Sequence, residues 1–200
     1  MNLQEYMKVK NYSYREYCDY LKAKYGEAKY DYCNKQFVKD RRVTRTKEGL
    51  VCHHIYEDTA IMLCNPDYAR LNPFRYQQAE NLCYCDYLEH LFLHILICEN
   101  PSEDHNISEA VGIGGVTSFL IPELNDLYSG WRTNQRWRQN CLDLILNDKD
   151  VYMTLIKRFK ESCSNYPLYD AEKLLRSFNA KFGLWTEDKN RELYNEISNL

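Results

Sequence analysis

The chain has 200 residues, of which 44% are hydrophobic and 14% aromatic, so it holds enough apolar material to bury a core. Its formal net charge of −3 gives no support for binding nucleic acid through overall charge. No basic segment followed by an apolar one opens the sequence, and no apolar run approaches the roughly 18 residues of a membrane helix. We therefore expect a folded, cytoplasmic protein with no signal peptide and no membrane partner.

The nine cysteines also favour a cytoplasmic protein. Their number is odd, their spacing is irregular, and a chain of this length does not need disulfides to fold. We expect mostly reduced, buried thiols. The paired C-x-x-C pattern of zinc sites is absent, and Cys83 with Cys85 is only a weak metal signal.

Charge is distributed unevenly along the chain. Residues 1–50 carry a net charge of +5, residues 51–110 carry −8, and residues 111–200 are balanced. The basic cluster that ends the first segment either engages phosphates or forms a solvated loop, and composition favours neither. Its members are Lys35, Lys39, Arg41, Arg42, Arg45 and Lys47.

The first half of the chain predicts a helix, a β-hairpin and a second helix. Residues 13–24 form a helix with Ser13 as N-cap, Glu16 at the capping-box position and Gly26 at the end. Residues 49–56 predict a strand and residues 59–64 a second one, joined by a turn at Glu57 and Asp58. Residues 66–79 predict a short helix and a loop interrupted at Pro73. Helical spacing of apolar residues then runs from Glu80 to Pro101.

The second half predicts helices only. The motif Gly112 to Gly115 lacks a Walker lysine, so close helix packing is favoured over phosphate binding. Further helices are expected at 133–147, 149–163, 169–182 and 186–198. The fold class is thus α+β and mainly α-helical, with a small β-hairpin-plus-helix core among additional helices. We divide it into an N-terminal segment 1–44, a core 45–100 and a helical extension 101–200, packed as one compact domain.

Four of the five histidines fall into two motifs. His53 and His54 are adjacent near the end of the first predicted strand, and His90 and His94 are four residues apart on one face of the following helix. Two imidazoles on successive turns and a third from the hairpin hold one metal ion and leave positions open for water and substrate. Neighbouring strand residues point to opposite faces, so one member of the doublet is expected to bind the ion and the other to act as a base.

These residues, with Asn81 between the two motifs, resemble the His-Asn-His (HNH) endonucleases, especially the DNase-colicin subgroup. The resemblance covers residues 45–96 and implies the ββα-metal fold and metal-dependent cleavage of phosphodiester bonds, usually in DNA. It makes His53, His90 and His94 the metal ligands, His54 the general base, and Asn81 the asparagine that orients the base. The interval between His54 and Asn81 is longer than in the compact motif, which implies an insertion such as residues 66–78.

Contacts with the substrate are assigned to basic residues on either side of the core. Arg45 is placed to reach a phosphate, and Glu48 either braces it or lies in solvent. Arg132 and Arg136 lie beside tryptophans in a pattern suited to clamping phosphates and stacking on bases. Packing of the tryptophans between helices is the alternative.

The leading hypothesis is an endonuclease that cuts DNA with one divalent ion, of which Zn, Ni, Mn and Mg are the candidates. Three imidazoles favour a transition metal over Mg. The same site in an RNase, and a non-catalytic metal-stapled protein that inhibits a protein partner, remain alternatives. The oligomeric state is left open.

Overall fold

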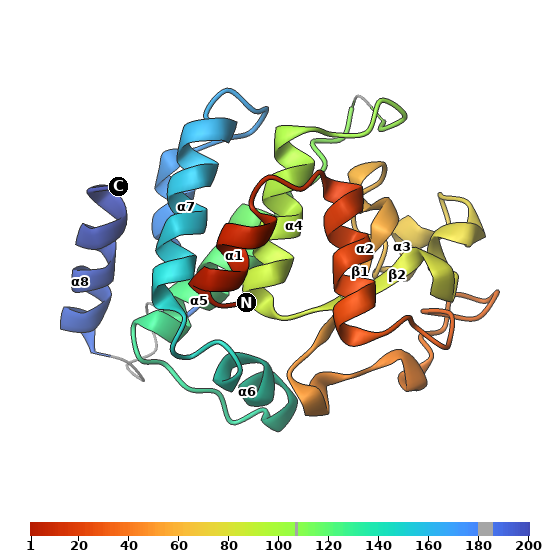
Figure 1. The fold of residues 1–200 in the computed structure, drawn as a ribbon, viewed down its shortest axis with the longest axis horizontal. Coiled ribbons are helices and arrows are strands. Elements are labelled where there is room, and N and C mark those ends of the chain that lie inside the picture. Colours follow the sequence, from red (N-terminus) through yellow and green to blue (C-terminus); the bar gives the residue numbers. More distant parts are fainter. Residues whose placement is uncertain (107, 180–185) are drawn as a thin grey trace.

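The computed structural model describes residues 1–106, 108–179 and 186–200. It confirms the α+β, mainly helical fold class, because the part of the chain that it describes holds eight α-helices and one two-stranded antiparallel sheet (Figure 1). None of the described helices is long and apolar enough to cross a membrane. All nine cysteines lie in the described ranges and are free, and seven of them are buried.

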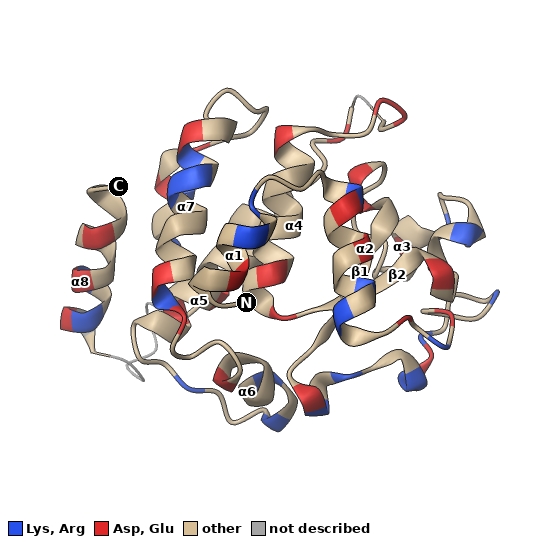
Figure 2. Ribbon diagram, in the orientation of Figure 1, with Lys and Arg blue, Asp and Glu red and all other residues tan. Residues whose placement is uncertain are grey.

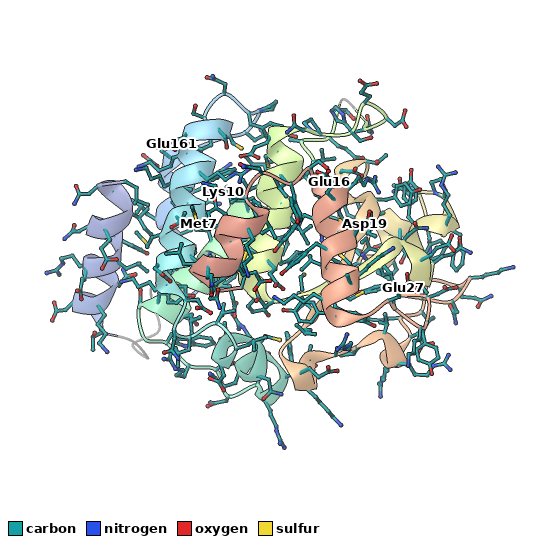
Figure 3. All side chains as sticks on the ribbon, in the orientation of Figure 1. Met7, Lys10, Glu16, Asp19, Glu27 and Glu161 are labelled. Carbon is teal, nitrogen blue, oxygen red and sulfur yellow. The ribbon has the colours of Figure 1, made fainter. Side chains whose placement is uncertain are left out.

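Two helices open the chain. Helix α1 (Leu3–Val9) was not predicted, whereas α2 (Tyr14–Tyr25) confirms the helix expected at 13–24. The Ser13 side chain accepts a hydrogen bond from the Glu16 amide, and Glu16 accepts one from the Ser13 amide, which satisfies two amides that the helix leaves unpaired. Polar residues of α2, among them Glu16 and Asp19, point away from the protein interior (Figure 3).

The sheet differs from the predicted hairpin. Strand β1 (Val51–His54) confirms the first predicted strand, but it pairs with β2 (Leu82–Cys85) and not with residues 59–64. The prediction of a strand at 59–64 was wrong. A short 3-10 helix covers Ile55–Asp58, and Met62 has a φ of 57°, a left-handed conformation that interrupts an extended strand.

Helix α4 (Tyr87–Glu99) begins later than predicted because β2 occupies its expected first residues. All four β2 residues are buried, so this apolar run has no exposed face, and periodicity cannot distinguish it from a buried helix. Asp86 and Glu89 form a second capping box that fixes the start of α4. Residues 55–81 connect the two strands, and they include the insertion, residues 66–78, which begins with the short helix α3 (Pro66–Ala69).

Helix α4 is the centre of the molecule. It lies between the hairpin and helix α7 (Lys149–Cys163) in Figure 1 and packs against both. Ten of its thirteen residues are buried. One continuous apolar core joins it to residues from Met1 to Ile197, so the helix that carries two of the histidines is held from several sides.

The remaining helices follow α4. A π-helix at Gly115–Leu120 continues into α5 (Ile121–Tyr128), and α6 (Arg136–Asp143) is shorter than the helix expected at 133–147. Helix α7 has the bounds expected, and α8 (Glu187–Ser198) confirms the last predicted helix. The helix predicted at 169–182 was wrong in type, since Ala171–Leu175 form a 3-10 helix, and residues 180–182 lie outside the described residues.

The glycine motif packs against α4, as expected. Gly112 has a φ of 80°, and a Cβ atom there would lie 2.8 Å from the carbonyl oxygen of His94. A Cβ atom at Gly115 would collide with the His94 ring itself. Both positions therefore require glycine, and Gly115 supports one face of a predicted metal ligand.

Candidate metal centre

The hairpin and α4 bring three predicted histidines together with one carboxylate. His53 at the end of β1, Glu57 in the following 3-10 helix, and His90 and His94 of α4 each offer an atom that could hold a metal ion. These four atoms lie within 4.8 Å of one another.

The separations suit a small ion. His53 Nδ1 lies 3.6 Å from Glu57 Oε2, and His94 Nε2 lies 3.3 Å from the same oxygen. The Nε2 atoms of His90 and His94 are 3.2 Å apart. Ligand bonds of 2.0–2.1 Å in a tetrahedral site place neighbouring ligand atoms about 3.3 Å apart. These three separations are close to the edge of such a site, and the remaining ones do not exceed 4.8 Å.

Tyr14 of α2 determines which nitrogen of His53 faces the cluster. The Tyr14 hydroxyl has one proton, which it donates to the carbonyl oxygen of Ile55 at 2.9 Å. Its contact with His53 Nε2 at 2.8 Å is therefore one in which the imidazole N–H donates. His53 Nδ1 then carries a lone pair, and it faces the Glu57 carboxylate.

Gln77 fixes His54 in the same way. The Gln77 amide nitrogen donates to the carbonyl oxygen of Leu63 at 3.0 Å, which directs its oxygen toward His54 Nε2 at 3.2 Å. His54 Nε2 is thus the donor, and its Nδ1 carries the lone pair. That Nδ1 lies 3.7 Å from Glu57 Oε1. His54 and His53 are both fully buried.

Burial disfavours the charged form of the histidines in the cluster. It lowers the pKa of His53 and His94 and lowers that of His90 to about 3. Burial acts to raise the pKa of Glu57, but the imidazoles around it hold that pKa below its usual range. The result is a largely buried carboxylate beside several imidazoles, an arrangement that a divalent cation between them stabilises.

One side of the cluster is accessible. His53 is fully buried, whereas His90 is partly exposed and the Glu57 side chain is 15% exposed. His90 and Glu57 are therefore the members of the cluster that lie nearest to solvent.

The Asn81 side chain bonds to the backbone of Arg75, and the side-chain partner of the His54 ring is Gln77. The Asn81 amide donates to the backbone carbonyl oxygen of Arg75 at 2.8 Å, so it braces the insertion. The contact with His54 that we expected of Asn81 is made by Gln77.

The predicted substrate-binding residues lie apart from the cluster. Arg45 forms a two-pronged ion pair with Glu48 and lines a pocket of about 370 Å³ that contains none of the histidines. Arg132 donates to two backbone carbonyls near the end of α5, and Arg136 begins α6. Trp131 is buried beneath Arg138, whereas Trp137 is half exposed, so packing between helices accounts for the first tryptophan only.

Sequence reasoning missed three residues of the site. Glu57 lies four residues after His53, and a carboxylate so close to a histidine doublet was a usable signal that we assigned to a turn. Gln77 and Tyr14 gave no such signal. They reach the histidines from 23 and 39 residues away, and only the folded insertion and α2 bring them there.

Comparisons of this chain with protein-family models, with curated proteins and with solved structures gave no match. The chemistry of the site therefore follows from its own donor set. Imidazole nitrogens suit Zn, Ni and other transition metals, and one carboxylate is compatible with all of them.

Proposed function

We propose that the protein is a metal-dependent endonuclease that hydrolyses phosphodiester bonds in DNA. His53, Glu57, His90 and His94 hold one divalent ion, and His54 is the general base. The proposal rests on the position of the His54 imidazole. Its Nε2 bonds to Gln77, and its Nδ1 lone pair lies next to the cluster but is not one of the four candidate ligand atoms.

The residues of the site have separate roles in the proposed reaction. The ion, when bound, stabilises the charge that develops on the phosphoryl group and on the leaving oxygen. His54 Nδ1 takes a proton from water as the water oxygen bonds to phosphorus and the bond to the leaving oxygen breaks. The resulting imidazolium has a neutral amide oxygen at one nitrogen and the Glu57 carboxylate 3.7 Å from the other, and both stabilise the positive charge.

The arrangement of the elements supports this assignment. Strand β1 carries the doublet, β2 pairs with it, and α4 follows directly with His90 and His94 on one face. This order of strand, strand and helix is the one that the HNH resemblance implies. The nine free cysteines suit a reducing compartment, which favours the cytoplasm as the place where the protein acts.

Glu57 favours a second candidate function. Four protein ligands around one ion complete a tetrahedral structural site, whereas a catalytic site keeps a position open. In that case the ion staples the hairpin to α4, and the protein acts by binding a protein partner.

Plasmid cleavage tests the two candidates. Metal-free protein is incubated with DNA and with Mg, Mn, Ni or Zn, alongside His54→Ala, a variant lacking both His90 and His94, and His105→Ala as a histidine control outside the cluster. We expect the first two variants to lose cutting, while His54→Ala still retains one ion per chain by elemental analysis. Undiminished cutting by His54→Ala contradicts the mechanism. A protein that holds the ion and cuts neither DNA nor RNA is the result expected of the structural site, and a preference for RNA would identify an RNase.

A further inference from the structure

Three cations lie over tyrosine rings, and each of these rings contacts a residue of the site or belongs to its neighbour in the chain. We propose that Arg15, Lys39 and Arg75 bind the phosphates of the DNA strand presented to His54. This inference rests on the proposed function and names substrate contacts other than those expected from the sequence.

Arg15 is held beside the His53 and Glu57 side of the cluster. Its guanidinium lies 5.5 Å from the ring centre of Tyr14, whose hydroxyl bonds to His53, and 5.2 Å from that of Tyr56, the neighbour of Glu57 in the chain. One nitrogen of the guanidinium also donates to both carboxylate oxygens of Asp58, at 2.7 and 2.9 Å. The Arg15 side chain remains 48% exposed, so its outer face is available to a ligand.

Lys39 approaches the site from the His54 side. Its ammonium lies 4.6 Å from the ring centre of Tyr32, and that ring lies 4.3 Å from the His54 ring. The basic loop is anchored there, because the Tyr32 amide donates to the Gln77 carbonyl oxygen and the Cys33 thiol donates to the Gln77 side chain. One member of the basic cluster is thus placed beside the base rather than in a free loop.

Arg75 belongs to the insertion. Its exposed guanidinium lies 5.7 Å from the ring centre of Tyr56 and 5.5 Å from that of Tyr76, and the two rings stack at 4.0 Å. Tyr56 precedes Glu57 and Tyr76 precedes Gln77, so the stack connects the ligand to the residue that holds the base. The insertion therefore brings a cation to the site.

The charges around the site favour a polyanion. Among the described residues, Lys39 and Arg75 make no ion pair with a carboxylate, and a bound divalent ion neutralises Glu57. Asp58 offsets the charge of Arg15 only. Lys39 and Arg75 are thus uncompensated, and Arg15 keeps an exposed face. Three such cations near one cluster match a ligand with several phosphates along a chain. Figure 2 shows the Lys and Arg residues of the preceding basic segment at the same end of the molecule as the hairpin.

The salt dependence of DNA binding tests the inference. All variants are made in His54→Ala protein, loaded with the metal, so that the labelled DNA duplex is bound and not cut. Arg75→Ala and Lys39→Ala are each expected to reduce the slope of log K against log salt concentration by about one. Arg15→Ala is combined with Asp58→Asn, so that no buried carboxylate is left unpaired. Lys157→Ala removes an equally exposed charge from α7, across α4 from the hairpin (Figure 1), and should leave the slope unchanged.

A kinetic readout separates binding from folding. With His54 intact, Arg75→Ala is expected to raise KM with kcat retained, and Arg75→Lys to restore part of the affinity because it restores the charge. An unchanged salt slope in both Arg75→Ala and Lys39→Ala, or an equal loss of slope in Lys157→Ala, overturns the inference. Failure of the proposed function has a different signature, since the wild-type protein would then cut no nucleic acid with any metal.

Discussion

The hairpin half and the α5–α8 half of the molecule bury polar groups in different ways. In the helical half, the Asn125 amide donates to the carbonyl oxygens of Leu174 and Arg176, and its oxygen accepts from the Tyr152 hydroxyl. In the hairpin half, His53, His54 and His94 each have a buried Nδ1 atom with no hydrogen-bond partner among the described residues.

This difference distinguishes buried polar groups that support the fold from buried polar groups that could hold a metal ion. Buried polar groups that only support a fold are normally paired, because an unpaired one costs about 1–3 kcal/mol. Single unpaired atoms also occur in the helical half, at Ser129, Trp131 and Asn190. Only in the hairpin half, within the residues that the structure describes, do imidazoles converge with a carboxylate in an arrangement that could hold a metal ion.

Removal of the Glu57 charge should have the largest effect on the metal cluster of the hairpin half. Glu57→Gln keeps the shape of the side chain and removes the group that the imidazoles surround, so we expect the affinity for Zn²⁺ to fall by at least about 100-fold, beyond the loss typical of changing a ligand's neighbour. Calorimetric titration of metal-free protein measures it. Glu48→Gln changes an exposed carboxylate that pairs with Arg45 outside the cluster and serves as control. Unchanged affinity in Glu57→Gln would mean that the three histidines hold the ion alone.

Asn125→Ala tests the other half. The substitution leaves two carbonyl oxygens and the Tyr152 hydroxyl unpaired in the core, so we expect the free energy of unfolding to fall by about 2 kcal/mol. Urea denaturation measures the change. Zn²⁺ affinity should stay at the wild-type value, and a parallel loss of metal binding would show that the two halves are not independent.

Acid should destabilise the metal-free protein through the hairpin half. Histidine in the unfolded chain has a pKa of about 6.5. In the folded chain burial lowers the pKa of His53 and His94 and brings that of His90 to about 3. Below about pH 6.5 the unfolded state therefore binds more protons, and the free energy of unfolding falls as pH falls, by up to about 1.4 kcal/mol per pH unit for each histidine.

Urea midpoints of metal-free protein between about pH 7.5 and 5.5 measure this dependence. His90→Gln removes one of the titrating groups and should make the dependence on pH shallower by up to one proton. A wild-type midpoint that does not change over this range would contradict the lowered pKa values.

The outcome of sequence reasoning follows the same division. Capping boxes and long amphipathic patterns are local, and they predicted α2, α7 and α8 closely. The partner of β1 depended on pairing across the insertion. The apolar run at 59–64 was predicted as the second strand, whereas Leu82–Cys85 was included in the helical pattern that starts at Glu80. Local pattern does not decide between two such runs, because burial of β2 on both faces depends on α2 and the rest of the core.

The site divides in the same manner. The three histidines brought together in the cluster were predictable, because a doublet and an i, i+4 pair are visible in the chain. The groups that hold the imidazoles in place were not. Gln77 lies in the insertion and Tyr14 on α2, and neither residue type nor spacing connects them to a histidine before the chain folds.

The smallest expected effect is that of Tyr14→Phe, which tests whether Tyr14 holds the His53 imidazole in place. Phenylalanine keeps the ring that packs edge-on against His53 and lies beneath Arg15, and it removes only the hydroxyl. His53 Nε2 then loses its acceptor, and the tautomer that directs Nδ1 at the ion is no longer enforced. We expect Zn²⁺ affinity to fall by about tenfold, the lower end of the loss seen when a ligand's hydrogen-bond partner is removed.

Tyr20→Phe removes a hydroxyl from the same helix, where it donates to Glu5, and should leave the affinity unchanged. Nitrogen chemical shifts of the His53 ring report the tautomer directly, so equal metal affinity and an unchanged His53 spectrum in Tyr14→Phe would show that α2 plays no part in setting the ligand.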